Sequence, residues 1–264
     1  MPELNNKAEA FRALHVRGRP LVLFNVWDPG SAKAVAAAGA RAIATGSWSV
    51  AAANGFSDGE RIPLDLALDN LQRIVAATAL PVSIDMESGY GKTAAQVGES
   101  IGRTVAAGAV GCNLEDSFPE NGKLRQLAEQ TQRIRQARTV ADAAGVRYFI
   151  NARTDVFFQK PPQQHDESML REAIDRARAF ADAGADGIFA PGLIDRTLIA
   201  RLAAAVPLPL NILVGEGSPS LELLAAAGVA RVSHGPGPYL SAMKLLEQTA
   251  RAVLGAAAGD AVRR

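Results

Sequence analysis

The sequence has 264 residues, of which 48% are hydrophobic, with 28 Lys and Arg against 27 Asp and Glu and a formal net charge of +1. This length suffices for one α/β barrel or two small domains, and the balanced charge without a basic run argues against nucleic-acid binding. Cys112 is the single cysteine, so an intramolecular disulfide and a cysteine-rich zinc site are excluded. Residues 1–13 are polar and helix-like, and no apolar run is long enough to span a membrane. We therefore expect a cytoplasmic protein with no membrane partner.

A repeated pattern runs along the chain: an Ala-rich helix end, a glycine, and then a short apolar strand. Its spacing of about 40 residues suits a βα unit. With the other apolar segments it predicts strands near 21–25, 42–45, 81–87, 112–115, 148–151, 188–190, 208–214 and 232–234. Helical patterns follow at 31–38, 65–77, 94–107, 124–143, 168–183, 194–204, 220–227 and 238–254.

Alternating strands and helices with nearly continuous apolar strands indicate a parallel sheet that is covered on both faces. Eight units in about 250 residues favour a (β/α)8 barrel, the TIM-barrel architecture, over a doubly wound open sheet. No linker or change in composition separates a second domain, so we expect residues 1–264 to form a single barrel domain.

Polar residues gather where the predicted strands end, which is the side of a barrel that carries the active site. Asp85 and Glu87 point the same way from one strand, because side chains alternate along a strand. Glu115 ends the next strand, and Arg153 ends the strand after it. Carboxylates at one point suit Mg²⁺, and a guanidinium beside them suits a substrate carboxylate. The alternative is a buried salt bridge between Arg153 and Glu115 that only closes the barrel.

Several ordered motifs resemble the isocitrate lyase/phosphoenolpyruvate mutase superfamily over nearly the whole chain. They are Asp85–Gly91, Asn113–Asp116, Ala152–Asp155, and a segment similar to the family's substrate loop, Gly46–Val50 followed by Asn54–Asp58. The resemblance implies an enzyme that cleaves or rearranges a C–C or P–C bond next to a pyruvate-like unit, with Mg²⁺ (or Mn²⁺) as cofactor. It also implies homo-oligomers, dimers or tetramers, in which the C-terminal helix is exchanged between subunits.

By the same resemblance, Asp85, Glu87 and Glu115 would hold the metal, partly through water. Backbone N–H groups of the segment Thr45, Gly46, Ser47 and Trp48 would face the substrate carboxylate, with Arg153 opposite. Asp58 would lie near the metal-bound waters, and Asn211 would contact the distal end of the substrate.

The chain departs from the family's lyases in one loop. Isocitrate and methylisocitrate lyases carry a catalytic cysteine there, in a Lys-Lys/Arg-Cys-Gly-His segment, whereas this chain has Ser117–Leu124 without cysteine or histidine. Asn121 and Lys123 remain as candidates for catalytic roles in this loop, although they equally suit an ordinary turn. His234, at the end of the last strand, is a weak candidate for substrate binding.

Three functions therefore remain open. The first is a lyase for a small 2-oxo or 2-hydroxy (di)carboxylic acid, by decarboxylation or retro-aldol cleavage. The second is a phosphonopyruvate hydrolase or mutase, and the third is a protein that binds a 2-oxo acid with little turnover. The apolar C-terminal run, Tyr239–Ala258, presents Leu245, Leu246, Val253 and Leu254 at helical spacing and would need either a partner subunit or its own barrel as a surface.

Overall fold

Eight parallel strands form the centre of the molecule. The structure is a computed structural model that describes the backbone of residues 2–261 and the side chains of residues 2–255. Met1, residues 262–264 and the side chains of residues 256–258 in the predicted C-terminal run lie outside this description. The strands are β1 (Leu21–Leu23), β2 (Ile43–Ala44), β3 (Val82–Asp85), β4 (Gly111–Glu115), β5 (Phe149–Arg153), β6 (Gly187–Phe189), β7 (Leu210–Leu213) and β8 (Arg231–Ser233).

The order of the strands is that of a barrel. Each strand pairs with the next along the chain from β2 to β8, and β8 pairs with β1. The seam between β1 and β2 is closed by a parallel bridge between Val26 and Thr45, where the Val26 N–H donates to the Ala44 carbonyl at 2.9 Å. The predicted (β/α)8 barrel is therefore confirmed, and the doubly wound sheet is excluded because its strand order would reverse in the middle.

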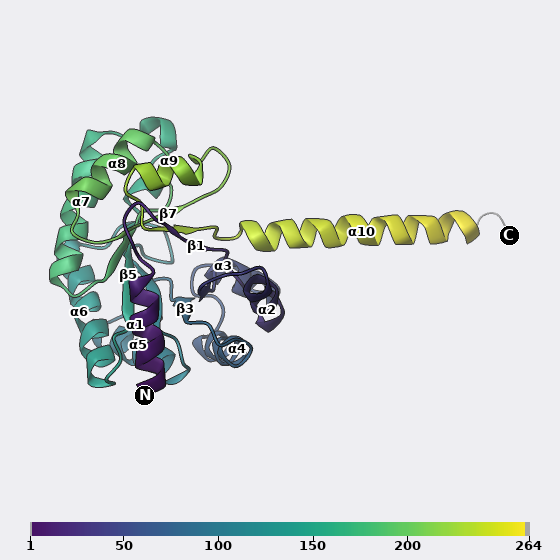
Figure 1. Cartoon of the computed structure of the whole chain (residues 1–264), viewed down its shortest axis with the longest axis horizontal. Coiled ribbons are helices and arrows are strands. Elements are labelled where there is room, and N and C mark those ends of the chain that lie inside the picture. The colour runs from purple at the N-terminus through teal and green to yellow at the C-terminus, as the bar shows by residue number, and fades with distance from the viewer. Residues whose placement is uncertain (1, 262–264) are drawn as a thin grey trace.

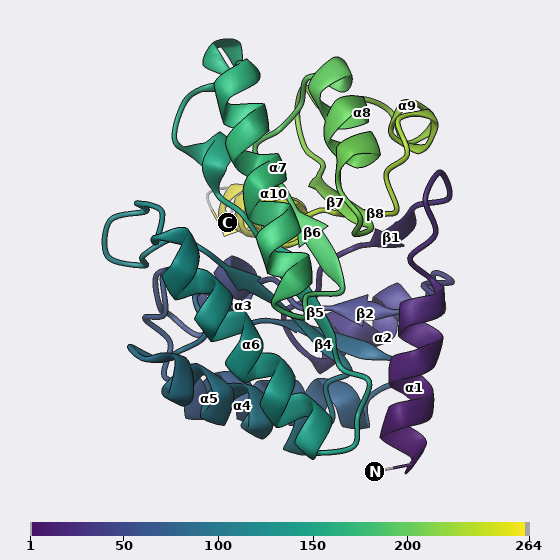
Figure 2. The same ribbon diagram turned by 90° about the vertical axis from the view of Figure 1, so that its left-hand side faces the viewer.

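Helices surround the strands, as Figure 2 shows from the side. They are α1 (Pro2–Ala13), α2 (Pro29–Ala37), α3 (Ser47–Ala53), α4 (Leu64–Ala76), α5 (Ala94–Ala106), α6 (Leu127–Ala143), α7 (Glu167–Asp182), α8 (Arg196–Ala205), α9 (Leu221–Ala226) and α10 (Gly237–Ala261). Local sequence explains their ends. Asp28 and Thr93 form capping boxes at the starts of α2 and α5, and glycines with positive φ, such as Gly108, follow the helix ends.

Helix α3 was not predicted. The sequence predicted a strand at 42–45 and no helix before residue 65, but Ser47 already begins a helix, because β2 is only two residues long and an alanine-rich stretch follows. Val50 and Ala51 of α3 pack with Ile62 in a small apolar cluster separate from the main core. The first turn of α3 is thereby held at the C-terminal end of the barrel.

Helix α1 packs at the opposite end, where the strands begin. Phe11 lies edge-on to Phe149 at the start of β5, with ring centroids 5.5 Å apart, and His15 stacks on the same ring at 4.1 Å. Phe11 is fully buried. This aromatic cluster fixes the N-terminal end of the barrel.

Helix α10 extends away from the barrel into solvent, as Figure 1 shows. Its apolar side chains are exposed, with 65% of Leu245 and 69% of Leu254 accessible. The alternative in which this helix covers its own barrel is therefore wrong for the described conformation. Among the described residues, no helix is both long and apolar enough to cross a membrane.

Candidate active site

A cavity of about 220 Å³ lies at the C-terminal ends of the strands. It is smaller than the roughly 300–1,000 Å³ of pockets for drug-sized ligands, which indicates a small substrate. Its lining residues come from every side of the barrel and are Asn25, Gly46, Ser47, Trp48, Asp58, Asp85, Asn113, Arg153, Phe158, Phe189, Pro191, Leu213, Ser233, Gly235 and Pro236.

Among these residues, Asp85 gives the clearest indication of a cation or water site. It ends β3, and its Oδ2 accepts a hydrogen bond from the Ser47 backbone N–H at 3.2 Å, at the start of α3. Its Oδ1 is buried and has no hydrogen-bond partner. A buried carboxylate oxygen without a partner is costly, so this atom is where a cation or a bound water would be stabilising.

Asp58 lies beside Asp85 at the mouth of the cavity. The Ser47 hydroxyl donates to Asp58 Oδ1 at 3.2 Å, so one serine connects both carboxylates. Partial burial and the charge of Asp85 raise the pKa of Asp58 above its ordinary value. Two carboxylates held this close repel each other, and a cation between them would relieve the repulsion.

Glu87, the second acid of the motif, uses both carboxylate oxygens in hydrogen bonds within the chain. Its Oε2 accepts from the backbone N–H groups of Gly59 at 2.8 Å and Glu60 at 2.7 Å, and its Oε1 accepts from the Tyr90 hydroxyl at 3.2 Å. Burial and the charges of Asp58 and Asp85 raise the pKa of Glu87 to about 7. The side chain is only 3% exposed and does not line the cavity.

Arg153 and Glu115 form the salt bridge that the sequence left open, with Nη1 and Oε2 2.7 Å apart. Asp155, to which no role was assigned, binds a second edge of the guanidinium, with Nε to Oδ1 at 2.6 Å and Nη2 to Oδ2 at 3.1 Å. Burial alone would lower the pKa of Arg153, but Glu115 and Asp155 overcome this and raise it. Arg153 is thus a fixed cation that also lines the cavity. The salt bridge and a substrate-binding role are compatible.

The carboxylate oxygens at the cavity suit a divalent cation that keeps several water ligands, but they do not surround it with protein ligands alone. Among the residues whose side chains are described, no three His, Cys, Asp or Glu side chains come together to hold a metal. The expected convergence of Asp85, Glu87 and Glu115 on one point is therefore not found, because Glu87 and Glu115 are tied to loop amides and to Arg153. Asp85 would then be the direct oxygen ligand, and Mg²⁺, which keeps several waters, would meet the other acids through water.

Three other predicted residues lie near the cavity without lining it. Thr45 Oγ1 accepts from the Asp85 backbone N–H at 3.0 Å and so supports the end of β3. Asn211 is buried inside the barrel and bonds Ser233. The His234 ring lies against Phe24, with centroids 5.1 Å apart, outside the cavity. The expectation that His234 faces the site is therefore not met, because the chain turns at the strand end.

Asn121 and Lys123 also lie away from the cavity. The Lys123 backbone N–H donates to Asn121 Oδ1 at 2.9 Å, which closes a local turn between the bridged residues Ser117 and Leu124. Both residues are exposed. In the described conformation they act as turn residues, and any catalytic role would need this loop to move.

Several cavity residues were missed from the sequence. Asn25 binds across the barrel seam, donating to the Thr45 carbonyl and accepting from the backbone N–H groups of His234 and Gly235, each at 2.9 Å. Its place at the end of the first predicted strand was a signal that could have identified it. Phe158, Phe189, Pro191 and Leu213 also line the cavity, and no sequence pattern distinguished them from core residues.

Comparison with known proteins supports this architecture. Residues 11–254 match the phosphoenolpyruvate phosphomutase family. An uncharacterized protein of Mycobacterium tuberculosis is 35% identical over 92% of this chain and 88% of its own length. An oxaloacetate decarboxylase of Bradyrhizobium sp. is 31% identical over 81% of this chain and 73% of its own length. A 2-methylisocitrate lyase of Salmonella typhimurium is 29% identical over 95% and 84%.

Solved structures of similar fold support the same family. A candidate phosphonomutase from Burkholderia cenocepacia has a TM-score of 0.92 at 56% identity, covering 96% of this chain and 99% of that chain. A phosphonopyruvate hydrolase bound to oxalate and Mg²⁺ shares the fold, with a TM-score of 0.79 at 24% identity over 93% of this chain and 86% of that chain. The chain therefore belongs to the phosphoenolpyruvate phosphomutase family and is an enzyme of the isocitrate lyase/PEP mutase superfamily.

Proposed function

We propose that this enzyme is a Mg²⁺-dependent carbon–carbon lyase that removes CO₂ from a small 2-oxo dicarboxylic acid such as oxaloacetate. The observation that carries the proposal is the mixed lining of the cavity. Asp58, Asp85 and Arg153 line it together with the apolar side chains of Phe158, Phe189, Pro191 and Leu213, and the Arg153 guanidinium lies 5.5 Å from the centroid of the Phe158 ring.

The charged part of the lining suits the 2-oxo acid unit. Asp85, through its unpartnered Oδ1, would hold Mg²⁺, with Asp58, Glu87 and Glu115 acting through water. When bound, Mg²⁺ supplies Lewis-acid stabilisation of negative charge on oxygen. Arg153 offers a fixed positive charge for the substrate carboxylate, since Glu115 and Asp155 already hold its guanidinium. Ser47 and Trp48, the first residues of α3, line the same cavity, and the positive end of a helix favours negative charge.

The apolar part of the lining suits the carboxylate that leaves. An ionised carboxylate is poorly solvated beside Phe158, Phe189, Pro191 and Leu213, and loss of neutral CO₂ relieves this. No Lys, His or Cys lines the cavity. Decarboxylation starts from a substrate that is already ionised, so it needs no base for its first step. Retro-aldol cleavage of a 2-hydroxy acid must first remove the hydroxyl proton, and here Asp58 is the group placed for that role.

The test is a substrate panel with Mg²⁺: oxaloacetate, dimethylmalate, methylisocitrate and phosphonopyruvate, with products identified by NMR. We expect pyruvate and CO₂ from oxaloacetate, and loss of the enzymatic rate with EDTA. The slow reaction of oxaloacetate with free Mg²⁺ is subtracted with a blank that contains Mg²⁺ and no enzyme. A turnover of dimethylmalate that exceeds that of oxaloacetate would overturn the decarboxylase assignment in favour of a substituted-malate lyase.

P–C chemistry is the second candidate, because the 56% identical structure is that of a candidate phosphonomutase. The cavity argues against it, since Arg153 is the one cation among the lining residues and a phosphonate carries more charge than a carboxylate. Release of inorganic phosphate from phosphonopyruvate, faster than pyruvate release from oxaloacetate, would establish it.

We also propose that the enzyme is a homo-oligomer that exchanges α10 between subunits. A groove of about 640 Å³ lies beside β1 and α2, where Val22 is 39% and Phe24 is 47% exposed on a barrel strand whose outer face helices usually cover. Helix α10 leaves its own barrel with an exposed apolar face (Figure 1). The helix of a second copy supplies the missing cover, and both apolar surfaces would be buried together.

Light scattering tests this assembly. Leu245→Glu with Leu246→Glu should give smaller particles than the wild-type protein, and Gln248→Glu on the same exposed helix is the matched control. A monomeric wild-type protein would contradict the exchange.

A further inference from the structure

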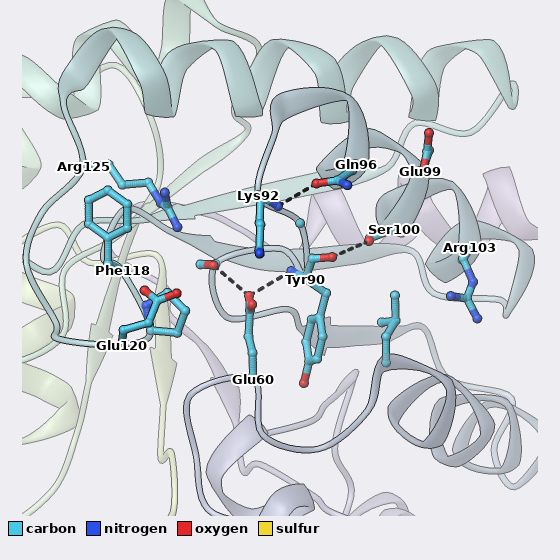
Figure 3. Close-up of a pocket in the computed structure, with 14 residues that line it drawn as sticks. Glu60, Tyr90, Lys92, Gln96, Glu99, Ser100, Arg103, Phe118, Glu120 and Arg125 are labelled. Atoms are coloured by element: carbon cyan, nitrogen blue, oxygen red, sulfur yellow. Dashed lines mark hydrogen bonds between the residues drawn. The ribbon is translucent and has the colours of Figure 1, made fainter.

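Two loops at the C-terminal end of β3 are bonded to each other through a carboxylate from each loop. From the loop between β3 and α5, Glu87 reaches the backbone of the loop between α3 and α4, where it accepts from Gly59 and Glu60. In return, Glu60 Oε1 accepts from the Ser88 hydroxyl at 2.7 Å and from the Tyr90 backbone N–H at 2.8 Å, as Figure 3 shows. We call the four residues Glu60, Glu87, Ser88 and Tyr90 the clasp.

The clasp contains unusual backbone. Glu60, Glu87 and Tyr90 have φ values of 57°, 48° and 51°, and among the described residues they are the only non-glycine residues with positive φ. Such conformations cost on the order of 1–3 kcal/mol each and persist only where surrounding contacts hold them. Strain concentrated at one point of a barrel rim indicates that this geometry serves the site rather than the fold.

The clasp bears directly on Asp58. This residue precedes Gly59, whose N–H is held by Glu87, and its own carboxylate lines the cavity beside Asp85. Asp58 is exposed, and among the described side chains only the Ser47 hydroxyl donates a hydrogen bond to it. Because Asp85 and Glu87 repel it, an unrestrained loop would carry it towards solvent. Two carboxylate anchors on the next two residues prevent this movement.

Glu60 itself faces a second, larger cavity. This outer cavity of about 750 Å³ lies on the far side of the clasp and is lined by Lys92, Arg103 and Arg125 as well as Glu60 (Figure 3). Glu60 does not line the catalytic cavity. Its effect on the reaction must therefore pass through the loop that it anchors.

From these contacts we infer that Glu60 is a positioning residue that holds Asp58 at the reacting end of the cavity through its bonds to Ser88 and Tyr90. The inference rests on the proposed function only for its effect on turnover. The loop anchoring itself is independent of the substrate.

The variants follow from the bonding. Glu60→Ala removes the acceptor for both bonds, and Ser88→Ala removes one of the two donors. Glu60→Gln keeps an amide oxygen at the position of Oε1, which can accept both bonds. Glu120→Ala is the matched control, because Glu120 is an exposed acid that lines the same outer cavity but lies outside the clasp.

Two measurements are made on each full-length variant: hydrogen exchange of the loop amides at 54–63, and kcat and KM for oxaloacetate with Mg²⁺. Glu60→Ala should raise exchange at Gly59 and Glu60 about tenfold or more and lower kcat about 10- to 100-fold, with a small change in KM. Glu60→Gln should restore most of both values, Ser88→Ala should be intermediate, and Glu120→Ala should match the wild type.

Unchanged loop exchange in Glu60→Ala overturns the anchoring. Increased exchange with unchanged kcat overturns the positioning role. If the wild-type protein does not decarboxylate oxaloacetate, the proposed function fails, and affinity for Mn²⁺ measured by EPR replaces kcat. Weaker Mn²⁺ binding in Glu60→Ala, restored in Glu60→Gln, then supports the positioning role, and equal binding in all variants overturns it.

Discussion

The two ends of the barrel differ in the side chains that they bring together, aromatic rings at one end and carboxylates at the other. At the N-terminal end, Phe11, His15 and Phe149 pack ring against ring, and burial lowers the pKa of His15 to about 3, so that it stays neutral. At the C-terminal end, Asp58, Asp85 and Glu87 crowd together, and strained backbone lies beside them. One end gains stability from apolar packing, and the other gives up stability to hold charges where a cation and a substrate can use them.

The sharpest way to probe this contrast is Asp85→Asn. The variant keeps the shape of the side chain but removes the charge that faces the cavity, so kcat/KM should fall by about 10³-fold or more, on the order of 4 kcal/mol. The melting temperature without Mg²⁺ should stay equal or rise, because repulsion with Asp58 and Glu87 is relieved. Steady-state kinetics and differential scanning fluorimetry measure both. Full Mg²⁺-dependent turnover in this variant would refute the metal role.

At the opposite end, Phe11→Ala should act on stability alone. Removal of this fully buried ring from the cluster with Phe149 should cost about 3–5 kcal/mol of unfolding free energy. Urea unfolding measures the loss, and kcat of the folded fraction should stay at the wild-type value. Asn6→Ala, on the exposed face of the same helix, is the control and should be neutral within about 0.5 kcal/mol. A fall in kcat for Phe11→Ala would show that the two ends are coupled.

The third prediction concerns pH in the presence of EDTA. Because the pKa of Glu87 is raised from 4.5 to about 7 in the folded state, folding retains a proton that the unfolded chain releases. Its contribution is therefore full below pH 4.5 and is lost as the pH rises through 7, by on the order of 3 kcal/mol. Glu87→Gln should remove this loss. Between pH 5 and 7.5, the unfolding free energy of the variant, measured with urea, should therefore rise relative to that of the wild type. Parallel pH profiles would contradict the assignment.

At the other end of the barrel, His15 should change the stability in the opposite direction with pH. Its folded pKa is lowered, so the unfolded chain binds a proton that the folded chain does not, and stability falls as the pH drops from 6.5 towards 3. His15→Phe keeps the ring stacked on Phe149 and should flatten the acid side of the profile only. The two variants together separate the two ends of the barrel within one titration.

Much of this site could be anticipated from sequence. Asp58, Asp85 and Arg153, with Gly46, Ser47 and Trp48, were named from ordered motifs, and the structure brings all of them to one cavity. The motifs work because a strand end followed by a glycine turn is a local arrangement, and a barrel brings all strand ends to one rim. The misplaced residues, His234, Asn121 and Lys123, lie where the chain turns after a strand, and the direction of a turn depends on its neighbours.

The sequence by itself determined the eight strands, their order and the acid-rich rim, since hydrophobic periodicity and glycine caps are local properties of the chain. Only the tertiary structure decided what each acid does: Asp85 keeps a buried oxygen without a partner, Glu87 holds a loop, and Glu115 pairs with Arg153. It also decided that α10 leaves the barrel and that apolar side chains line the same cavity as the acids. These outcomes depend on contacts between segments far apart in the chain, and a hydrogen bond between two loops has no period that a sequence could display.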